Sequence, residues 1–189
     1  MIPNRVIDYI GEPDASSFYY SDYCEDYCGG DYDNCDCSKY DYYDYHPKYG
    51  FQNEISGNSW QSHDGENFPH SLWFKFKASH VLTKISFSSS IYLEQAPKEF
   101  AVIASQDCIN FQDLLHIEDA AFERQNQAQS WEIPEEKRAP YTCIGIKIHS
   151  SKGEDGDVIL DDDGNAYQYI YEAEHATSVQ NMVMWEKRF

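Results

Sequence analysis

Residues 71–90, SLWFKFKASHVLTKISFSSS, decide the expected fold. Apolar and polar side chains alternate in both halves of this stretch, and the apolar members are Leu72, Phe74, Phe76, Val81, Ile85 and Phe87. Alternation with a period of two places one set of side chains on a buried face of a sheet and the other set in solvent. Aromatic and β-branched residues dominate, with Ser, His and Lys between the halves. The stretch therefore predicts two strands joined by a short turn, a hairpin at the centre of a β-sandwich.

Further runs with strand character follow at 99–105, 130–134, 141–150, 167–172 and 179–185. The run 99–105, EFAVIAS, is apolar at most positions, which is typical of a strand buried on both faces. Residues 111–123 fit a short helix or a loop, and the polar run after them favours a loop. Short strands without a long helix indicate an all-β chain, an antiparallel β-sandwich or jelly roll.

Length and charge narrow the classes of function. The chain of 189 residues fits one domain, or one domain with a tail. It has 33 Asp and Glu against 14 Lys and Arg, a net charge of −19. Such a surface repels phosphate backbones, so we expect no nucleic-acid partner. No apolar run reaches the roughly 18 residues of a membrane helix, so we expect no membrane span.

The first 47 residues differ in composition from residues 48–189, which carry the sandwich pattern. Between residues 19 and 49, tyrosines alternate with aspartates and aliphatic residues are almost absent. Such a segment cannot build a core, so its order must come from disulfides or from packing on another surface. Residues 5–10 alternate briefly and predict a strand, which pairs either with the sandwich or with a neighbouring molecule.

The tyrosine- and aspartate-rich tract leaves several interpretations open. Tyrosines beside carboxylates are typical of sulfated sites in secreted proteins, and tyrosine-rich tracts are also hydroxylated or cross-linked in adhesive matrices. The simpler interpretation is an unmodified acidic tail whose rings pack on the sandwich.

The cysteines favour an oxidising, extracellular compartment. Four crowd into the N-terminal segment, and we expect disulfides among them: Cys24, Cys28, Cys35 and Cys37. Their spacing is not the paired C-x2-C of common zinc sites. Cys108 and Cys143 either form a bridge between strand ends or remain as two buried thiols. We therefore expect a secreted protein.

The acidic segment 161–172 has the spacing of a calcium-binding loop. Oxygen-bearing residues stand at its positions 1, 3, 5 and 12, namely Asp161, Asp163, Asn165 and Glu172. Position 6, a glycine in such loops, is Ala166 here, and no helix is expected beside it. Two interpretations stay open, a Ca²⁺ site and a solvated acidic insertion between strands.

The order of these features resembles the discoidin family, also called coagulation factor V/VIII type C domains. The matching pieces are NSW at 58–60, SLWFKF at 71–76, VLTKISF at 81–87, APKEFAVIASQD at 96–107, YTCIGIKI at 141–148 and VQNMVMW at 179–185. The resemblance covers residues 49–187 and implies a galactose-binding-like jelly roll. It also implies a domain that recognises a ligand rather than an enzyme.

The function predicted from the sequence is a non-enzymatic extracellular recognition or adhesion module. We expect loops 51–68 and 88–95, at one end of the sandwich, to bind a glycan or an extracellular protein. Aromatic and polar side chains of the kind that sugar sites use are Asn53, Trp60, His63, Asp64 and Tyr92. The chain has no zinc-protease, nucleophile-elbow or phosphate-loop motif.

The alternative is a self-assembling structural subunit. In that hypothesis residues 1–47 dock on, or cross-link, a neighbouring copy in an extracellular fibre or matrix. Head-to-tail contacts of this kind build filaments or other homo-oligomers.

Overall fold

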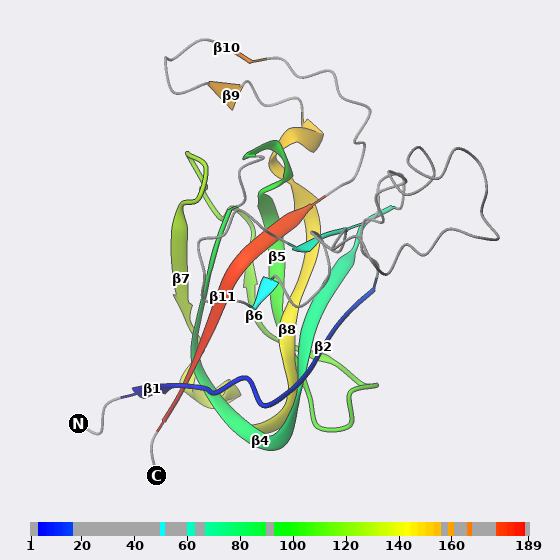
Figure 1. The fold of residues 1–189 in the computed structure, drawn as a ribbon, viewed down its shortest axis with the longest axis vertical. Helices are drawn as coiled ribbons and strands as arrows, with labels where there is room; N and C mark the ends of the chain where they lie inside the picture. The colour runs from blue at the N-terminus through cyan, green and yellow to red at the C-terminus, as the bar shows by residue number, and fades with distance from the viewer. Residues whose placement is uncertain are drawn as a thin grey trace, which may run out of the picture.

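The computed structural model describes residues 4–16, 50–51, 60–62, 67–89, 93–155, 159–160, 166–167 and 177–187. Within these residues the chain folds as two antiparallel β-sheets that share one long strand, β4 (His70–Ser88) (Figure 1). The predicted antiparallel β-sandwich is therefore confirmed. Within the described residues, no helix is long and apolar enough to cross a membrane.

The first half of β4 lies in a five-stranded sheet. The order of the strands is β2–β4–β8–β5–β6. The other members are β2 (Gly11–Ala15), β8 (Pro140–Ser151), β5 (Pro97–Ser105) and β6 (Gln112–Ile117). The predicted strands at 99–105 and 141–150 correspond to β5 and β8, both with long runs of buried residues.

The second half of β4 lies in the opposing sheet, between β7 (Ala128–Glu132) and β11 (Ser178–Lys187). Two short strands pair with the two ends of β11, namely β3 (Trp60–Gln61) and β1 (Asn4–Val6). A separate ribbon consists of β9 (Ile159–Leu160) and β10 (Ala166–Tyr167). The short 3-10 helices are η3 (Leu93–Gln95), η4 (Glu135–Lys137) and η5 (Lys152–Asp155).

The hairpin predicted for residues 71–90 is wrong, because β4 is one continuous strand of 19 residues. Its pairing with β8 shifts register between Lys75 and His80, and there the strand curves from one sheet into the other (Figure 1). The stretch contains no Gly, Pro or Asn that would close a tight turn. The bend also changes which positions face inward, so Leu82 is buried where Val81 was expected.

The loop favoured for residues 111–123 is also corrected, because residues 112–117 form strand β6. The register of β6 against β5 shifts between Val102 and Ile103. At this shift the neighbouring residues Leu114 and Leu115 both pack toward the core. The period-two alternation is therefore broken, which explains why the sequence did not predict the strand.

Aromatic rings fill the space between the two sheets. Phe87 of β4 packs against Phe100 of β5, with 5.2 Å between ring centroids and an interplanar angle of 71°. Trp131 of β7 lies 4.8 Å from Phe87 and 4.9 Å from Phe100. Tilted and edge-on contacts of this kind are the favoured arrangements of aromatic pairs. These rings hold the opposed sheets in one relative position.

The beginning of the chain is part of both sheets. β1 pairs with β11, and β2 pairs with β4, so the predicted strand at 5–10 is replaced by two strands that flank residues 7–10. Tyr9 in this crossing packs against Phe51 and Phe74, and its hydroxyl donates to the carbonyl of Met182. Burial raises the pKa of the Tyr9 hydroxyl. The early strands thus pair within their own chain, whereas residues 17–47 lie outside the described residues.

Candidate functional site

The strand ends opposite the bend of β4 lie at the top of Figure 1. We call this part the loop end. Its described residues are 60–62, 89, 93–97, 120–127, 151–153 and 177. They come from segments far apart in the chain, and buried polar side chains join them.

One set of hydrogen bonds centres on Gln180 of β11. The side-chain amide nitrogen of Gln180 donates to the carbonyl of Ser89, at 2.9 Å, and to Oδ1 of Asn126. The Ser89 hydroxyl donates to the carbonyl of Arg124 and accepts from the backbone N–H of Gln127. These bonds fix the chain after β4 against the chain before β7. Buried bonds of this kind keep loops in a defined conformation.

A second set joins the start of β11 to the other loops. The backbone N–H of Ser62 donates to the carbonyl of Thr177 at 2.9 Å, and the Thr177 N–H donates to the Ser62 hydroxyl at 3.0 Å. The Thr177 hydroxyl donates to the carbonyl of Gln95 at 3.0 Å. The backbone N–H of Lys152 donates to the carbonyl of Ala96. The loop end therefore has a rigid polar base made from four separate segments.

One acceptor in this base is unsatisfied. The side chain of Gln95 is 8% exposed, and its amide oxygen Oε1 has no hydrogen-bond partner within the described residues. A buried acceptor without a donor destabilises a fold by about 1–3 kcal/mol. An ordered water that bridges to a neighbouring polar group is one way to satisfy such an acceptor.

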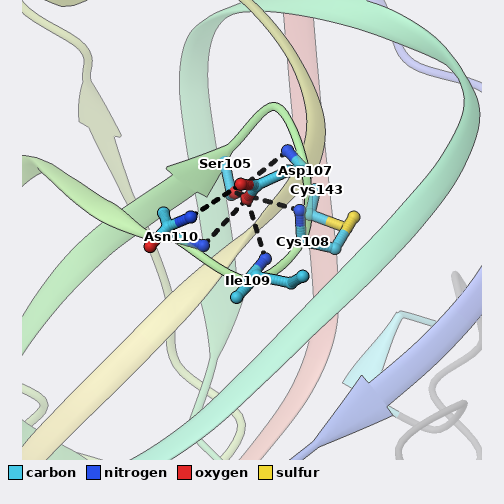
Figure 2. Close-up of a disulfide and its surroundings, with 6 residues drawn as sticks. All are labelled: Ser105, Asp107, Cys108, Ile109, Asn110 and Cys143. Carbon is cyan, nitrogen blue, oxygen red and sulfur yellow. Dashed lines mark hydrogen bonds between the residues drawn. A yellow bond between two sulfur atoms is a disulfide. The ribbon is translucent and has the colours of Figure 1, made fainter.

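The Cys108–Cys143 disulfide lies at the other end of the sandwich, near the bend of β4 (Figure 2). It joins the turn after β5 to β8, with 5.3 Å between the two Cα atoms. The sequence left open a disulfide bridge or two buried thiols, and the structure has the disulfide bridge.

Asp107 organises the same turn. Its carboxylate accepts hydrogen bonds from the backbone N–H groups of Asn110 and Ile109, at 2.8 and 2.9 Å, and from the Ser105 hydroxyl at 2.7 Å (Figure 2). These bonds hold the pKa of the Asp107 carboxyl well below its usual range. The turn is thus fixed both covalently and by hydrogen bonds, and it presents Ile109 with 80% of its surface exposed.

A buried carboxylate ties β1 to the bend of β4. Glu186 of β11 accepts from Arg5 Nε at 2.6 Å and contacts His80 Nδ1 at 2.8 Å. Burial by itself raises the pKa of the Glu186 carboxyl, but the hydrogen bonds from His80 and Arg5 outweigh burial and leave that pKa below its ordinary value. The sequence did not predict this cluster, because Arg5 and Glu186 are separated by 181 positions.

Solved structures with the same architecture include carbohydrate-binding modules. One is CpGH89CBM32-5 from Clostridium perfringens in complex with GalNAc-β-1,3-galactose, with a TM-score of 0.58, 9% identity, and coverage of 92% of this chain and 93% of that one. The chain has the discoidin-type, galactose-binding-like fold. The resemblance stated from the sequence is therefore confirmed at the level of the fold.

Two further structures agree with this galactose-binding-like assignment. The family 32 module of Clostridium perfringens NanJ in complex with galactose has a TM-score of 0.58 at 10% identity, covering 93% of each chain. Chitosan-binding module 1 from a chitosanase/glucanase of Paenibacillus sp. IK-5 has a TM-score of 0.55 at 8% identity, covering 94% of this chain and 96% of that one. No family model and no curated protein sequence matches the chain.

Of the residues predicted to contact a ligand, the structure describes only Trp60. Trp60 has no exposed surface, since it lies in β3 opposite Val179 and within the core. Its predicted ligand contact is therefore corrected, and its ring instead supports the base of the loop end. The other predicted contacts lie outside the described residues, namely Asn53, His63, Asp64 and Tyr92. His63 and Tyr92 directly adjoin Ser62 and Leu93 of the loop end.

The predicted metal and N-terminal disulfide sites lie outside the described residues. This applies to Asp161, Asp163, Asn165 and Glu172, and to Cys24, Cys28, Cys35 and Cys37. In the part of the chain that the structure describes, no group of three or more His, Cys, Asp or Glu side chains is placed to hold a metal ion. Calcium binding at 161–172 stays a prediction.

Proposed function

We propose that this chain is a non-enzymatic extracellular module that binds a glycan at the loop end. The observation that carries the proposal is the rigid polar base, in which Thr177 joins Ser62 to the Gln95 carbonyl, at the ends of the two loops predicted to contact the ligand. Ligand sites typically combine a preformed base with a few oriented polar groups.

Two further observations support the proposal. The modules of similar fold from Clostridium perfringens were solved with GalNAc-β-1,3-galactose and with galactose. The Cys108–Cys143 disulfide fits an extracellular protein, because stable disulfides persist in oxidising compartments.

The side chains that we assign to ligand contact come from the two loops predicted from the sequence. Asn53, His63 and Asp64 supply hydrogen-bonding groups, and Tyr92 supplies a ring that packs against the C–H face of a pyranose. Ser62 and Leu93, their neighbours in the chain, belong to the rigid base.

A glycan array followed by calorimetric titration tests this function. We expect the oxidised full-length chain to bind glycans that end in galactose or GalNAc, and His63→Ala and Tyr92→Ala to weaken binding about tenfold or more. Lys84→Gln is the matched control, because Lys84 lies over the Trp185 ring on the outer face of the sheet that contains β7 and β11. A folded chain that binds no arrayed glycan would contradict the proposal, and so would binding that both loop variants leave unchanged.

A further inference from the structure

Two aromatic rings stand on the outer face of the five-stranded sheet. Trp73 alternates with Leu72 and Phe74, which point into the core, so its indole points outward and is partly exposed. The indole lies 5.5 Å from the ring of Phe111, at an interplanar angle of 58°. Neither ring belongs to the core between the sheets. The core therefore does not explain why two large aromatic side chains occur here.

The neighbour of Trp73 on β8 has no side chain. Gly145 stands directly opposite Trp73, and a Cβ added to Gly145 would lie only 2.5 Å from the Trp73 Cα and 2.6 Å from its Cβ. On the other side of Trp73 stands the exposed Asp14 of β2. The indole thus has a glycine on one flank and a carboxylate on the other.

A cationic group adjoins the rings. Lys147 lies two positions from Gly145 on the same face of β8, which puts it diagonal to Trp73 and within reach of a long side chain. The Lys147 ammonium makes no hydrogen bond or ion pair with any described residue. In a chain with a net charge of −19, Lys147 is a cation beside two partly exposed rings.

Polar groups complete the surroundings of Lys147. His116 of β6 stands across Ala101 from Lys147, and its ring lies 5.7 Å from that of His149. The Nε2 atom of His116 lies 3.1 Å from the carboxylate oxygen Oε1 of Glu99. Burial, and then the Lys147 ammonium, lower the pKa of the His149 imidazole. The His149 imidazole is therefore neutral at pH 7. In this state one ring nitrogen donates a hydrogen bond and the other accepts one.

We propose that this outer face binds a saccharide that carries a carboxylate, that is, a uronic acid residue. The Trp73 indole packs against the C–H face of the pyranose, beside Phe111. The Lys147 ammonium pairs with the sugar carboxylate. The carboxylates of Asp14 and Asp113, the latter opposite Ile103 of β5, accept hydrogen bonds from sugar hydroxyls.

The charges select this class of ligand. The net charge of −19 repels a long polyanion, whereas a short acidic oligosaccharide carries few carboxylates, one of which can pair with Lys147. A neutral sugar makes no ion pair with the Lys147 ammonium, whereas a uronic acid does. This surface lies on a face of the sandwich and not at the loop end, so the inference does not depend on the proposed function.

Titration of the oxidised full-length chain with trigalacturonate tests the inference, and its trimethyl ester is the neutral probe. We expect the acid to bind, the ester to bind about tenfold more weakly or worse, and Lys147→Gln to weaken binding of the acid to the same degree. Lys84→Gln removes a lysine that also adjoins a tryptophan, but on the opposite sheet, and should leave the affinity unchanged. Trp73→Ala should abolish binding, with circular dichroism as the check on its fold.

Three results would each overturn the inference. They are the absence of trigalacturonate binding, equal affinities for the acid and its ester, and equal effects of Lys147→Gln and Lys84→Gln. Lys147→Gln should not change binding of galactose-terminated glycans, so failure of this inference is distinguishable from failure of the loop-end proposal.

Discussion

At the scale of single residues, Glu186 shows how one buried carboxylate fastens the beginning of the chain to its end. Its side chain is 9% exposed and contacts both Arg5 and His80. Truncating one member of such a cluster leaves its partners without hydrogen bonds. The resulting loss in the free energy of unfolding exceeds the net contribution that the interactions made.

We predict that Glu186→Gln lowers the free energy of unfolding by about 1–3 kcal/mol at pH 7. The pKa of Glu186 lies below its ordinary value of 4.5, so the folded state binds the proton less tightly than the unfolded state. The contribution is therefore complete above pH 4.5 and is lost as the pH falls through the folded-state pKa. Urea unfolding of both proteins at pH 7 and pH 3 checks this, and a difference that persists undiminished at pH 3 would refute it.

Gly145 gives a second prediction at this scale. A Cβ at this position would meet the Leu72 carbonyl oxygen at 2.1 Å, and backbone cannot move aside as a flexible side chain can. We expect Gly145→Ala to lower the free energy of unfolding by about 1–3 kcal/mol and to displace Trp73. Thermal unfolding and tryptophan fluorescence measure the two effects. An unchanged melting temperature would show that β4 and β8 do not approach so closely.

At the scale of elements, the sequence was most informative where the signal was local. β5 and β8 follow from their own apolar runs, because a strand buried on both faces needs no knowledge of its partners. The bend of β4 and the register shift in β6 depend on tertiary pairing. In the sequence, a bend looks like a turn, and adjacent inward residues such as Leu114 and Leu115 do not look like a strand.

Removal of the Cys108–Cys143 disulfide gives a prediction at the scale of elements. The disulfide closes a loop over a sequence separation of 35, for which chain-entropy estimates give about 3–4 kcal/mol. We expect the double variant Cys108→Ser, Cys143→Ser to lose that amount of stability and to retain its β-sheet circular dichroism spectrum. Urea midpoints of the two oxidised proteins give the comparison. Equal midpoints would mean that the hydrogen bonds of Asp107 hold the turn without the bridge.

At the scale of the whole molecule, the sequence predicted the sandwich. The candidate site was predicted only in part. Trp60 was selected because aromatic residues are common in sugar sites, but a lone tryptophan beside a loop has the same appearance in the sequence whether it is exposed or buried. The role of Gln95 was missed, because nothing in the local sequence marks a residue whose backbone carbonyl accepts a hydrogen bond from the distant Thr177.

The outer face also emerges only from the assembled sheet. Trp73 was predicted to face solvent, yet its proximity to Phe111 and Lys147 depends on the pairing of β4 with β8 and of β8 with β5. The two proposed binding surfaces therefore lie apart on one sandwich, one at the loop end and one on the outer face of a sheet.

The central claim is that the loop end binds a glycan, and NMR mapping tests it most directly. The oxidised, ¹⁵N-labelled chain is titrated with GalNAc-β-1,3-galactose while backbone amide shifts are followed. We predict the largest shifts at Ser62, Leu93, Gln95 and their neighbours, with Trp73 and Lys147 unchanged. Shifts confined to the end of the sandwich near the β4 bend, or no shifts at saturating disaccharide, would contradict the account.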